Sequence, residues 1–491
     1  MIQYNIKKKL TSLTLLIGAL LMACNDFEEL NTDPTRLTDV DAASLLTQVV
    51  FDAGTRSRSY GPIGNYIGQY WTNTSLIDQR HRYDFRGSDS DAVYNVIYGI
   101  LNDVSDLKQR AMAEGLDDYL GAAIVIDTYL TTYLTDVFGP VPFNESIKGD
   151  QLNFTPSFDD QELIYRANLD SLEKAYQLLA TAPGGNFIRG GDPFYFGDNT
   201  KWRKLANSLK LRMLMKIVNV DPSVASQISN LIDQEELISS VDENAAIIYD
   251  GRFGLEAANA TGTAGSVALG ETFADLMHET LDPRRPHMAN LGVDVNGEAI
   301  NVDEEGNPIY LGVPSGEEPD IIRDFNGLAA PYTGLNGQTA PSLLLSHAEV
   351  EFYIAEAILK GYASGDLSDA AMHYLAGIRS SCEWWGVDND EIEAHLAKAN
   401  VQLSDNVPQA LQQIYREEYI NFYYQGYDGW LNYRRINAPA FNIGSAMLTT
   451  EIMQRMVYPP LLKAVNADNY NRAVQSLDKG DDLLSRGWWS N

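Results

Sequence analysis

The sequence predicts a mostly α-helical protein made of tetratricopeptide-like helical hairpins, with an irregular region of loops and short hairpins that we expect to bind the ligand. Two observations support the helices. Apolar residues recur every three or four positions in several long stretches, and short polar turns join neighbouring stretches. A third observation predicts the irregular region. Around residues 240–340, Asn-Gly and Glu-Gly-Asn turns separate short apolar runs.

Residues 1–23 predict a lipoprotein signal peptide. Lysines at 7–9 form a positive segment, and the apolar run over 10–23 that follows is too short for a comfortable membrane span. The next residue is Cys24, and the sequence LMAC that it closes resembles a bacterial lipobox. We therefore expect Cys24 to be the first mature residue and to carry acyl chains that anchor the protein in membrane lipid. A plain secretory signal with a chance cysteine is the alternative.

Residues 24–45 are polar and acidic, so we expect a tether that leads into a folded body over 46–491. Within that body, helical periodicity is clearest in the stretches 126–137, 169–179, 202–213, 345–359 and 411–422. The segment 355–378 joins two periodic stretches through a short polar turn, which is the pattern of a helical hairpin.

The chain is strongly acidic. Its 67 acidic and 36 basic residues give a formal net charge of −31, which becomes −34 when the three lysines of the signal peptide are removed. This balance argues against nucleic acid as a partner, because binding there depends on phosphate neutralisation by Lys and Arg. It is compatible with neutral or cationic ligands. With Cys24 acylated, Cys382 has no partner for an intramolecular disulfide, and we expect it to be a small buried residue.

No motif of a common enzyme or cofactor site occurs in the sequence. It contains no HExxH, no GxSxG, no Walker A sequence and no GxGxxG after a strand. Abundant carboxylates leave a surface hydrolase as an open alternative, because carboxylate separation is a property of the folded protein. Asp294, Asn296 and Glu298 begin like a calcium loop but lack its glycine at the sixth position, so we expect an ordinary turn. We predict no cofactor, no metal and no enzymatic activity.

Two aromatic clusters are the clearest sign of a binding site. The C–H face of a sugar stacks on a flat ring, while neighbouring polar side chains hold its hydroxyl groups. Tyr66, Tyr70 and Trp71 lie beside polar residues in the first cluster, and Trp384 and Trp385 form the second. We predict these five residues to bind the ligand, with core packing as the alternative because large rings dominate protein cores. Adjacent tryptophans cannot both point inward from one helix face, so at least one of the pair should be exposed or lie under a loop.

Several segments, in their order along the chain, resemble the SusD/RagB family of nutrient-binding outer-membrane lipoproteins. They are TDVFGPVPFNES (135–146), KWRKLANSLKLRMLMKI (201–217), LDPRRPHM (281–288), APSLLLSHAEVEFYIAEAILKG (340–361), GWLNYRRINAPA (429–440) and GDDLLSRGWWSN (480–491). No single segment is decisive, but their order together with the lipobox is specific.

This resemblance implies a fold built around four tetratricopeptide-like hairpins, with a variable half that binds the ligand. It also implies a lipid-anchored protein on the surface of the outer membrane. Such a protein would capture oligosaccharides, act as the lid of a SusC-like TonB-dependent transporter and catalyse no reaction. Peptides, which the RagB branch binds, are the alternative ligand, and a surface hydrolase is the least favoured alternative.

Overall fold

The computed structural model describes residues 40–55, 57–74, 79–181, 191–248, 266–332 and 342–490. The predicted signal peptide, Cys24 and most of the predicted tether lie outside the described residues. The compact unit extends from Ala42 to Asn491. Helix α3 (Ala42–Thr55) is the first helix of this unit, and the first two residues of that helix are already buried. The folded body therefore begins slightly before the boundary expected at residue 46.

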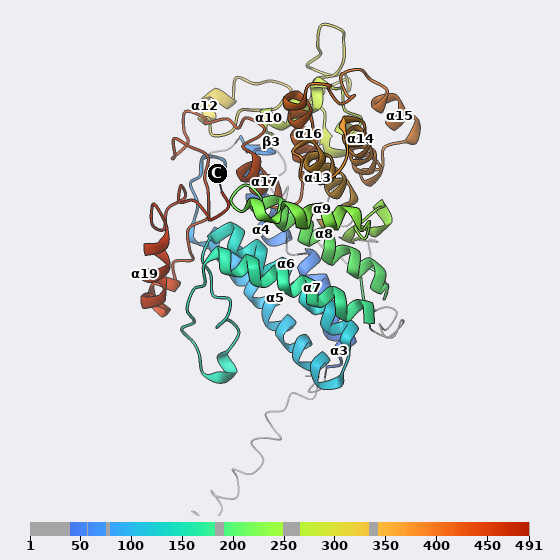
Figure 1. The fold of residues 1–491 in the computed structure, drawn as a ribbon. Helices are drawn as coiled ribbons and strands as arrows, with labels where there is room; N and C mark the ends of the chain where they lie inside the picture. The colour runs from blue at the N-terminus through green and yellow to red at the C-terminus, as the bar shows by residue number, and fades with distance from the viewer. Residues whose placement is uncertain are drawn as a thin grey trace, which may run out of the picture. The chain divides into compact units, whose positions relative to one another are not determined.

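Consecutive helices build the N-terminal half of the compact unit, as predicted. After α3 they are α4 (Ser57–Ile67), α5 (Gly87–Glu114), α6 (Asp117–Phe138), α7 (Gln161–Thr181), α8 (Asn199–Ile217) and α9 (Ala225–Asp233). Figure 1 shows α5, α6, α7 and α8 side by side, and each packs most extensively against its neighbours in sequence. Gly115 ends α5 in the left-handed conformation, with a φ of 68°. Because only two residues separate α5 from α6, these helices form an antiparallel hairpin.

A second group of helices follows the middle region. It contains α13 (His347–Leu359), α14 (Leu367–Trp384), α15 (Asn389–Leu396), α16 (Val407–Asn421), α17 (Asp428–Ile436), α18 (Leu462–Val465) and α19 (Ala467–Ser476). Helices α13 and α14 form the hairpin predicted over 355–378. Asp366 caps α14 by accepting hydrogen bonds from two backbone amides of its first turn. The predicted stripe 345–359 begins too early, because Leu345 belongs to a strand and Ser346 caps α13.

The described part of the middle region contains only short elements, as its turn pattern predicted. Three two-stranded antiparallel sheets join β1 (Trp71–Asn73) to β3 (Val267–Leu269), β2 (Ala245–Ile247) to β6 (Ser342–Leu345), and β4 (Ala289–Asn290) to β5 (Ala330–Pro331). Short helices are α10 (Glu271–Glu279), α11 (Arg285–Met288) and α12 (Pro319–Ile322). The described residues also form the 3-10 turns η1 (Arg80–Arg82), η2 (Gly149–Gln151), η3 (Pro222–Val224) and η4 (Val241–Glu243).

Two small hairpins occupy residues 293–308, each closed by an antiparallel bridge. In the first, one carboxylate oxygen of Asp294 accepts hydrogen bonds from the backbone N–H groups of Asn296 and Glu298, at 2.8 and 3.0 Å. An aspartate that bonds to backbone amides a few residues ahead stabilises a tight turn. The segment therefore folds as an ordinary turn, as predicted.

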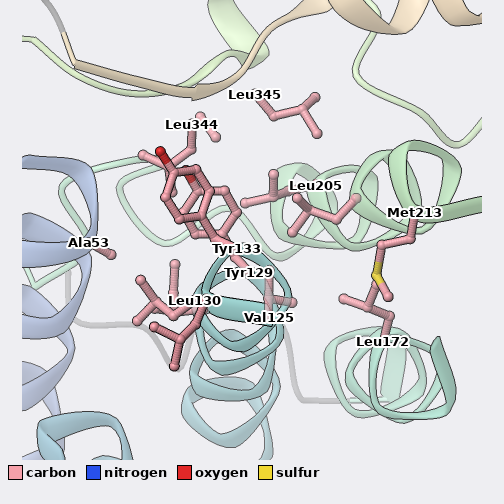
Figure 2. Packing of buried hydrophobic residues seen from close by; sticks show 14 of the residues in the cluster. Ala53, Val125, Tyr129, Leu130, Tyr133, Leu172, Leu205, Met213, Leu344 and Leu345 are labelled. Atoms are coloured by element: carbon pink, nitrogen blue, oxygen red, sulfur yellow. The ribbon is translucent and has the colours of Figure 1, made fainter. Parts of the chain in front are cut away.

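Helix α6 lies at the centre of the main hydrophobic core. Its residues are buried from Asp118 to Ile126 and again from Thr128 to Phe138, so it is covered on every side rather than along one stripe. The covering elements include α3, α5, α7 and α8. Figure 2 shows side chains of α6 packed with others from α3, α7, α8 and β6; the labelled residues are Ala53, Val125, Tyr129, Leu130, Tyr133, Leu172, Leu205, Met213, Leu344 and Leu345.

Candidate ligand-binding site

The first predicted aromatic cluster and Trp385 of the second, which are far apart in the sequence, meet in one place. We call this assembly the aromatic cluster. Its buried rings are Tyr66, Tyr70, Trp71, Phe273, Tyr419, Phe422 and Tyr423, and half-buried rings at its edge are Tyr310, Trp385, Tyr424 and Phe441. Helix α16 and the turn after it supply several of these rings, while α4, β1, α10 and the end of α14 supply others.

Tyr66, Tyr70 and Trp71 form the inner layer of the aromatic cluster. Tyr66 is 3% exposed, and the other two are fully buried. The Tyr70 ring stacks on Tyr419 with 4.5 Å between centroids, and its hydroxyl donates to the Tyr419 backbone carbonyl at 2.7 Å. The indole N–H of Trp71 donates to the Tyr423 hydroxyl at 3.1 Å.

These three rings therefore have no open face on which a sugar could stack, and the core-packing alternative describes their position. Contacts between segments that are far apart in the chain explain why these rings are buried. Residue Gln69 adopts a left-handed φ of 57° after α4, and β1 then pairs with β3, which lies far along the chain. Together these features place both following rings beneath α16. The polar neighbours that suggested a surface site do not determine which segment covers the rings.

Trp384 and Trp385 close α14, and both are half-buried. Neither points fully inward, as expected for adjacent tryptophans. The ring of Trp385 lies 5.9 Å from that of Tyr423, so it joins the outer edge of the aromatic cluster. Of the predicted site residues, this pair alone retains ring surface for a ligand.

Two half-buried tyrosines that sequence reasoning missed, Tyr424 and Tyr310, lie with Trp385 at the edge of the cluster. We call these three residues the aromatic rim. The Tyr424 ring contacts Trp71, with 5.5 Å between centroids, and its buried hydroxyl has no hydrogen-bond partner among the described residues. Burial raises the pKa of Tyr424, so this hydroxyl stays protonated at neutral pH. An unsatisfied buried hydroxyl is costly, so a ligand or water oxygen that reached it would be favoured.

Polar side chains surround Tyr310. The Arg285 guanidinium lies over its ring, 5.4 Å from the centroid. A second contact joins that guanidinium to His278 Nδ1 at 3.2 Å, and His278 Nε2 lies 3.4 Å from a carboxylate oxygen of Asp303. Burial lowers the pKa of Arg285. The arrangement places hydrogen-bonding groups beside an aromatic face, which is the combination that sugar binding requires.

A buried arginine positions the rim. Arg284 donates to the carboxylates of Asp282 and Glu417, each at 2.6 Å, and to the Ser381 hydroxyl at 2.9 Å. Its partners belong to the segment before α11, to α16 and to α14. Burial disfavours the charge on Arg284, but these two carboxylates raise its pKa well above the ordinary value. The ion pairs therefore fix the end of α14, and with it Trp385, against α16.

A separate concavity lies elsewhere on the described surface. This groove has a volume of about 680 Å³ and runs along α14 between α15 and η4. Met372, Leu375 and Leu396 line it together with Arg379 and Glu383. No Trp, Tyr or Phe lines it, so it offers no ring for sugar stacking. Within the described residues, no group of three His, Cys, Asp or Glu side chains is placed to hold a metal ion.

Comparison with known proteins places the chain in a family. Residues 34–459 match a family model of SusD-like proteins described as starch-binding and associating with the outer membrane. No curated protein matches the chain. Among the helices of the described residues, none is both long enough and apolar enough to cross a membrane.

Solved structures share the fold. One similar structure is a chitin-binding protein, with 24% identity and a TM-score of 0.79, covering 92% of this chain and 100% of that one. A SusD homologue from Bacteroides fragilis has 22% identity and a TM-score of 0.76, over 92% and 99% of the two chains. A chitin-binding SusD homologue from Flavobacterium johnsoniae has 18% identity and a TM-score of 0.74, over 91% and 97%. The family match covers most of the sequence, and the chain therefore belongs to the SusD-like family of binding proteins that associate with the outer membrane.

Proposed function

We propose that this protein is a lipid-anchored surface protein that captures oligosaccharides for a SusC-like TonB-dependent transporter. It serves as the lid of that transporter and catalyses no reaction. The observation that supports oligosaccharide binding best is the aromatic rim, because half-buried rings lie there and polar side chains contact one of them. Two of the similar structures are named as chitin-binding proteins, which makes chito-oligosaccharides the first ligands to test.

Binding at the rim uses contacts that are individually weak. The ring of Trp385 provides a stacking face, and Arg285 and His278 provide hydrogen bonds to sugar hydroxyl groups. Each aromatic contact contributes on the order of 1 kcal/mol beyond the area it buries. Several such contacts give affinity without deep enclosure, so a captured oligosaccharide can be released to the transporter.

The test is loss of oligosaccharide binding in Trp385→Ala. We expect roughly tenfold weaker retention in affinity electrophoresis and in titration with chito-oligosaccharides, since a tenfold change corresponds to about 1.4 kcal/mol. The matched control is Phe154→Ala, which removes a ring that is 71% exposed and lies outside the aromatic cluster. Unchanged retention by Trp385→Ala, with a thermal melt like that of the wild type, would remove Trp385 from the site.

Peptide binding is the second candidate, and the groove along α14 is the observation that favours it. An aliphatic lining together with Glu383 and Glu393 suits an extended segment with apolar and basic side chains. A glycan array and a pulldown from a protein digest, run on the same preparation, separate the two candidates. Capture of basic peptides that is lost in Met372→Lys, together with a blank glycan array, would replace the oligosaccharide proposal.

A further inference from the structure

A pocket of about 410 Å³ lies beside the C-terminal end of α17, away from the aromatic rim. Its walls come from α17, from the loop that follows, and from the C-terminal segment. Tyr433 and Phe441 line it as a parallel stacked pair, with 4.1 Å between ring centroids and 7° between ring planes. Both rings are half-buried. Because Phe441 also packs against the aromatic cluster, this pocket adjoins that cluster at a different edge from Trp385.

Arg434 places a buried positive charge at this pocket. It is 3% exposed, and its guanidinium lies between the rings of Trp430 and Trp489, 4.7 and 4.6 Å from their centroids. Its terminal nitrogens donate to the backbone carbonyl of Asp136 and to the hydroxyl of Ser490, both at 2.6 Å. The Nε–H has no partner among the described residues. Burial lowers the pKa of Arg434 to about 10, so the group remains charged at pH 7.

Arg434 differs from the other buried arginines of the described residues because no carboxylate lies within 4.0 Å of it, although the more distant carboxylate of Asp136 raises its pKa. Each of those has a carboxylate within 4.0 Å: Arg82 with Glu318, Arg212 with Glu349, Arg284 with Asp282 and Glu417, Arg435 with Glu356 and Glu418, and Arg455 with Asp481. Buried charges are normally paired, because an unpaired charge in a low-dielectric surrounding is costly. A negative group brought to this pocket would therefore reduce that cost.

Arg486 adds an exposed cation to the same pocket, and it forms no ion pair within the described ranges. The only acidic residue in the lining is the exposed Glu451. Asn437 and Gln454 also line the pocket, and the buried side-chain oxygen of Gln454 lacks a described partner. A locally positive, aromatic-walled pocket thus occurs in a chain whose formal net charge is −31.

We propose that this pocket binds a carboxylate-bearing sugar, a hexuronate unit of an acidic oligosaccharide. The sugar ring lies against the stacked pair of Tyr433 and Phe441, and Arg486 holds the carboxylate, since a guanidinium matches a carboxylate with two parallel hydrogen bonds. Arg434 does not touch the sugar, but its buried positive charge attracts the carboxylate from a distance. The inference rests on the proposed function, because it names an acidic class of oligosaccharide for a protein proposed to capture oligosaccharides.

The experiment compares digalacturonate with its dimethyl ester, which keeps the sugar rings and removes both charges. We expect the wild-type protein to bind the acid about tenfold more tightly than the ester, and Arg486→Gln to abolish that preference, because one charge-assisted hydrogen bond is worth roughly that difference. The control Arg472→Gln removes an exposed cation on α19, outside the pocket, and should keep the preference. Arg486 is exposed, so its variant should melt like the wild type.

Equal affinity of the wild-type protein for acid and ester, or an unchanged preference in Arg486→Gln, would overturn this inference. A tripeptide that binds more tightly than digalacturonate and loses affinity in Arg486→Gln would also overturn it, since the pocket would then recognise a peptide carboxylate. The Trp385→Ala test with neutral chito-oligosaccharides is independent of these results. If that test succeeds while the acid preference is absent, only the hexuronate inference fails; if the wild-type protein binds no saccharide, the proposed function fails with it.

Discussion

Glu351 shows how a single side chain joins two helices of a hairpin. Its two carboxylate oxygens lie 3.0 Å from His347 Nε2 on its own helix, α13, and 2.7 Å from His373 Nδ1 on α14. Burial raises the pKa of Glu351, but the hydrogen bonds from the two histidines outweigh it and lower the pKa to about 2. The folded state therefore favours the ionised carboxylate more strongly than the unfolded state does.

This shift predicts a pH-dependent contribution to stability. A carboxyl group whose pKa is lower in the folded state than its unfolded value of about 4.3 stabilises the fold above that value, and the contribution is lost as pH falls toward about 2. At about pH 5.5, Glu351→Gln should lower the free energy of unfolding by roughly 1–3 kcal/mol. Urea unfolding at a series of pH values measures the difference, which should shrink below about pH 4.

The control for that prediction is Glu391→Gln, which removes an exposed carboxylate on α15. It should leave the free energy of unfolding within about 0.5 kcal/mol of the wild-type value. A Glu351→Gln difference that stays constant from pH 6 down to about pH 3 would contradict the assignment to ionisation. It would indicate lost packing instead.

Single residues also show the limit of local sequence patterns. Trp202, Trp430 and Trp489 are buried. Trp71 is equally buried, although its polar neighbours indicated a surface position. The cover over Trp71 comes from α16 and the turn after it, and no pattern within residues 65–75 records that contact.

At the level of elements, the aromatic cluster depends on a close approach between two backbones. Gly64 of α4 lies against the turn between α16 and α17, where an added Cβ would come within 2.2 Å of the Gly426 carbonyl oxygen. This contact places α4, and the Tyr70–Trp71 segment after it, against α16. A side chain at position 64 would push α4 away from the cluster.

We therefore expect Gly64→Ala to destabilise the protein by roughly 1–3 kcal/mol, because the new methyl group meets backbone that cannot move aside easily. Gly99→Ala is the matched control. Gly99 lies exposed in the interior of α5 with no atom within 4 Å of an added Cβ, so alanine there should stabilise the helix by about 0.5–1 kcal/mol. Opposite shifts in the urea midpoint would confirm both. Equal shifts would show that helix propensity alone decides the result.

Across the compact unit, one buried ion pair joins a helix before the middle region to a helix after it, and others join helices of the second group to one another. Arg212 on α8 pairs with Glu349 on α13, and both side chains are almost completely buried. Arg435 on α17 pairs with Glu356 on α13 at 2.6 Å and with Glu418 on α16 at 2.8 Å. Removing one member of such a pair leaves an uncompensated charge and typically costs about 3–5 kcal/mol. These contacts hold the two helical groups in one arrangement.

The whole protein is predicted to reach its membrane through Cys24. Cys24→Ser should move the protein from the membrane fraction to the soluble fraction, because an unacylated chain loses its lipid anchor. The control is Cys382→Ala, which changes the fully buried cysteine of α14 and should leave the protein in the membrane fraction. Immunoblots of fractionated cells measure both. Membrane retention of Cys24→Ser would contradict the lipoprotein assignment.

Much of the fold could be predicted from local patterns. The stripes 126–137, 169–179 and 202–213 lie within α6, α7 and α8, and the hairpin at 355–378 is present. Helix α6 is buried on all sides rather than along one stripe, because α3, α5, α7 and α8 surround it. Helical periodicity reports one element at a time, so it does not say how many neighbours cover that element.

The sequence by itself determined the helical class, the irregular character of the middle region and the likeness to SusD-like proteins, since each depends on residue order and spacing. Only the tertiary structure decided which aromatic rings keep an open face. Trp385, Tyr424 and Tyr310 are half-buried, whereas Tyr70 and Trp71 are fully buried. The physical reason is that the exposure of a ring depends on contacts between segments far apart in the chain, and the spacing of neighbouring residues carries no record of those contacts.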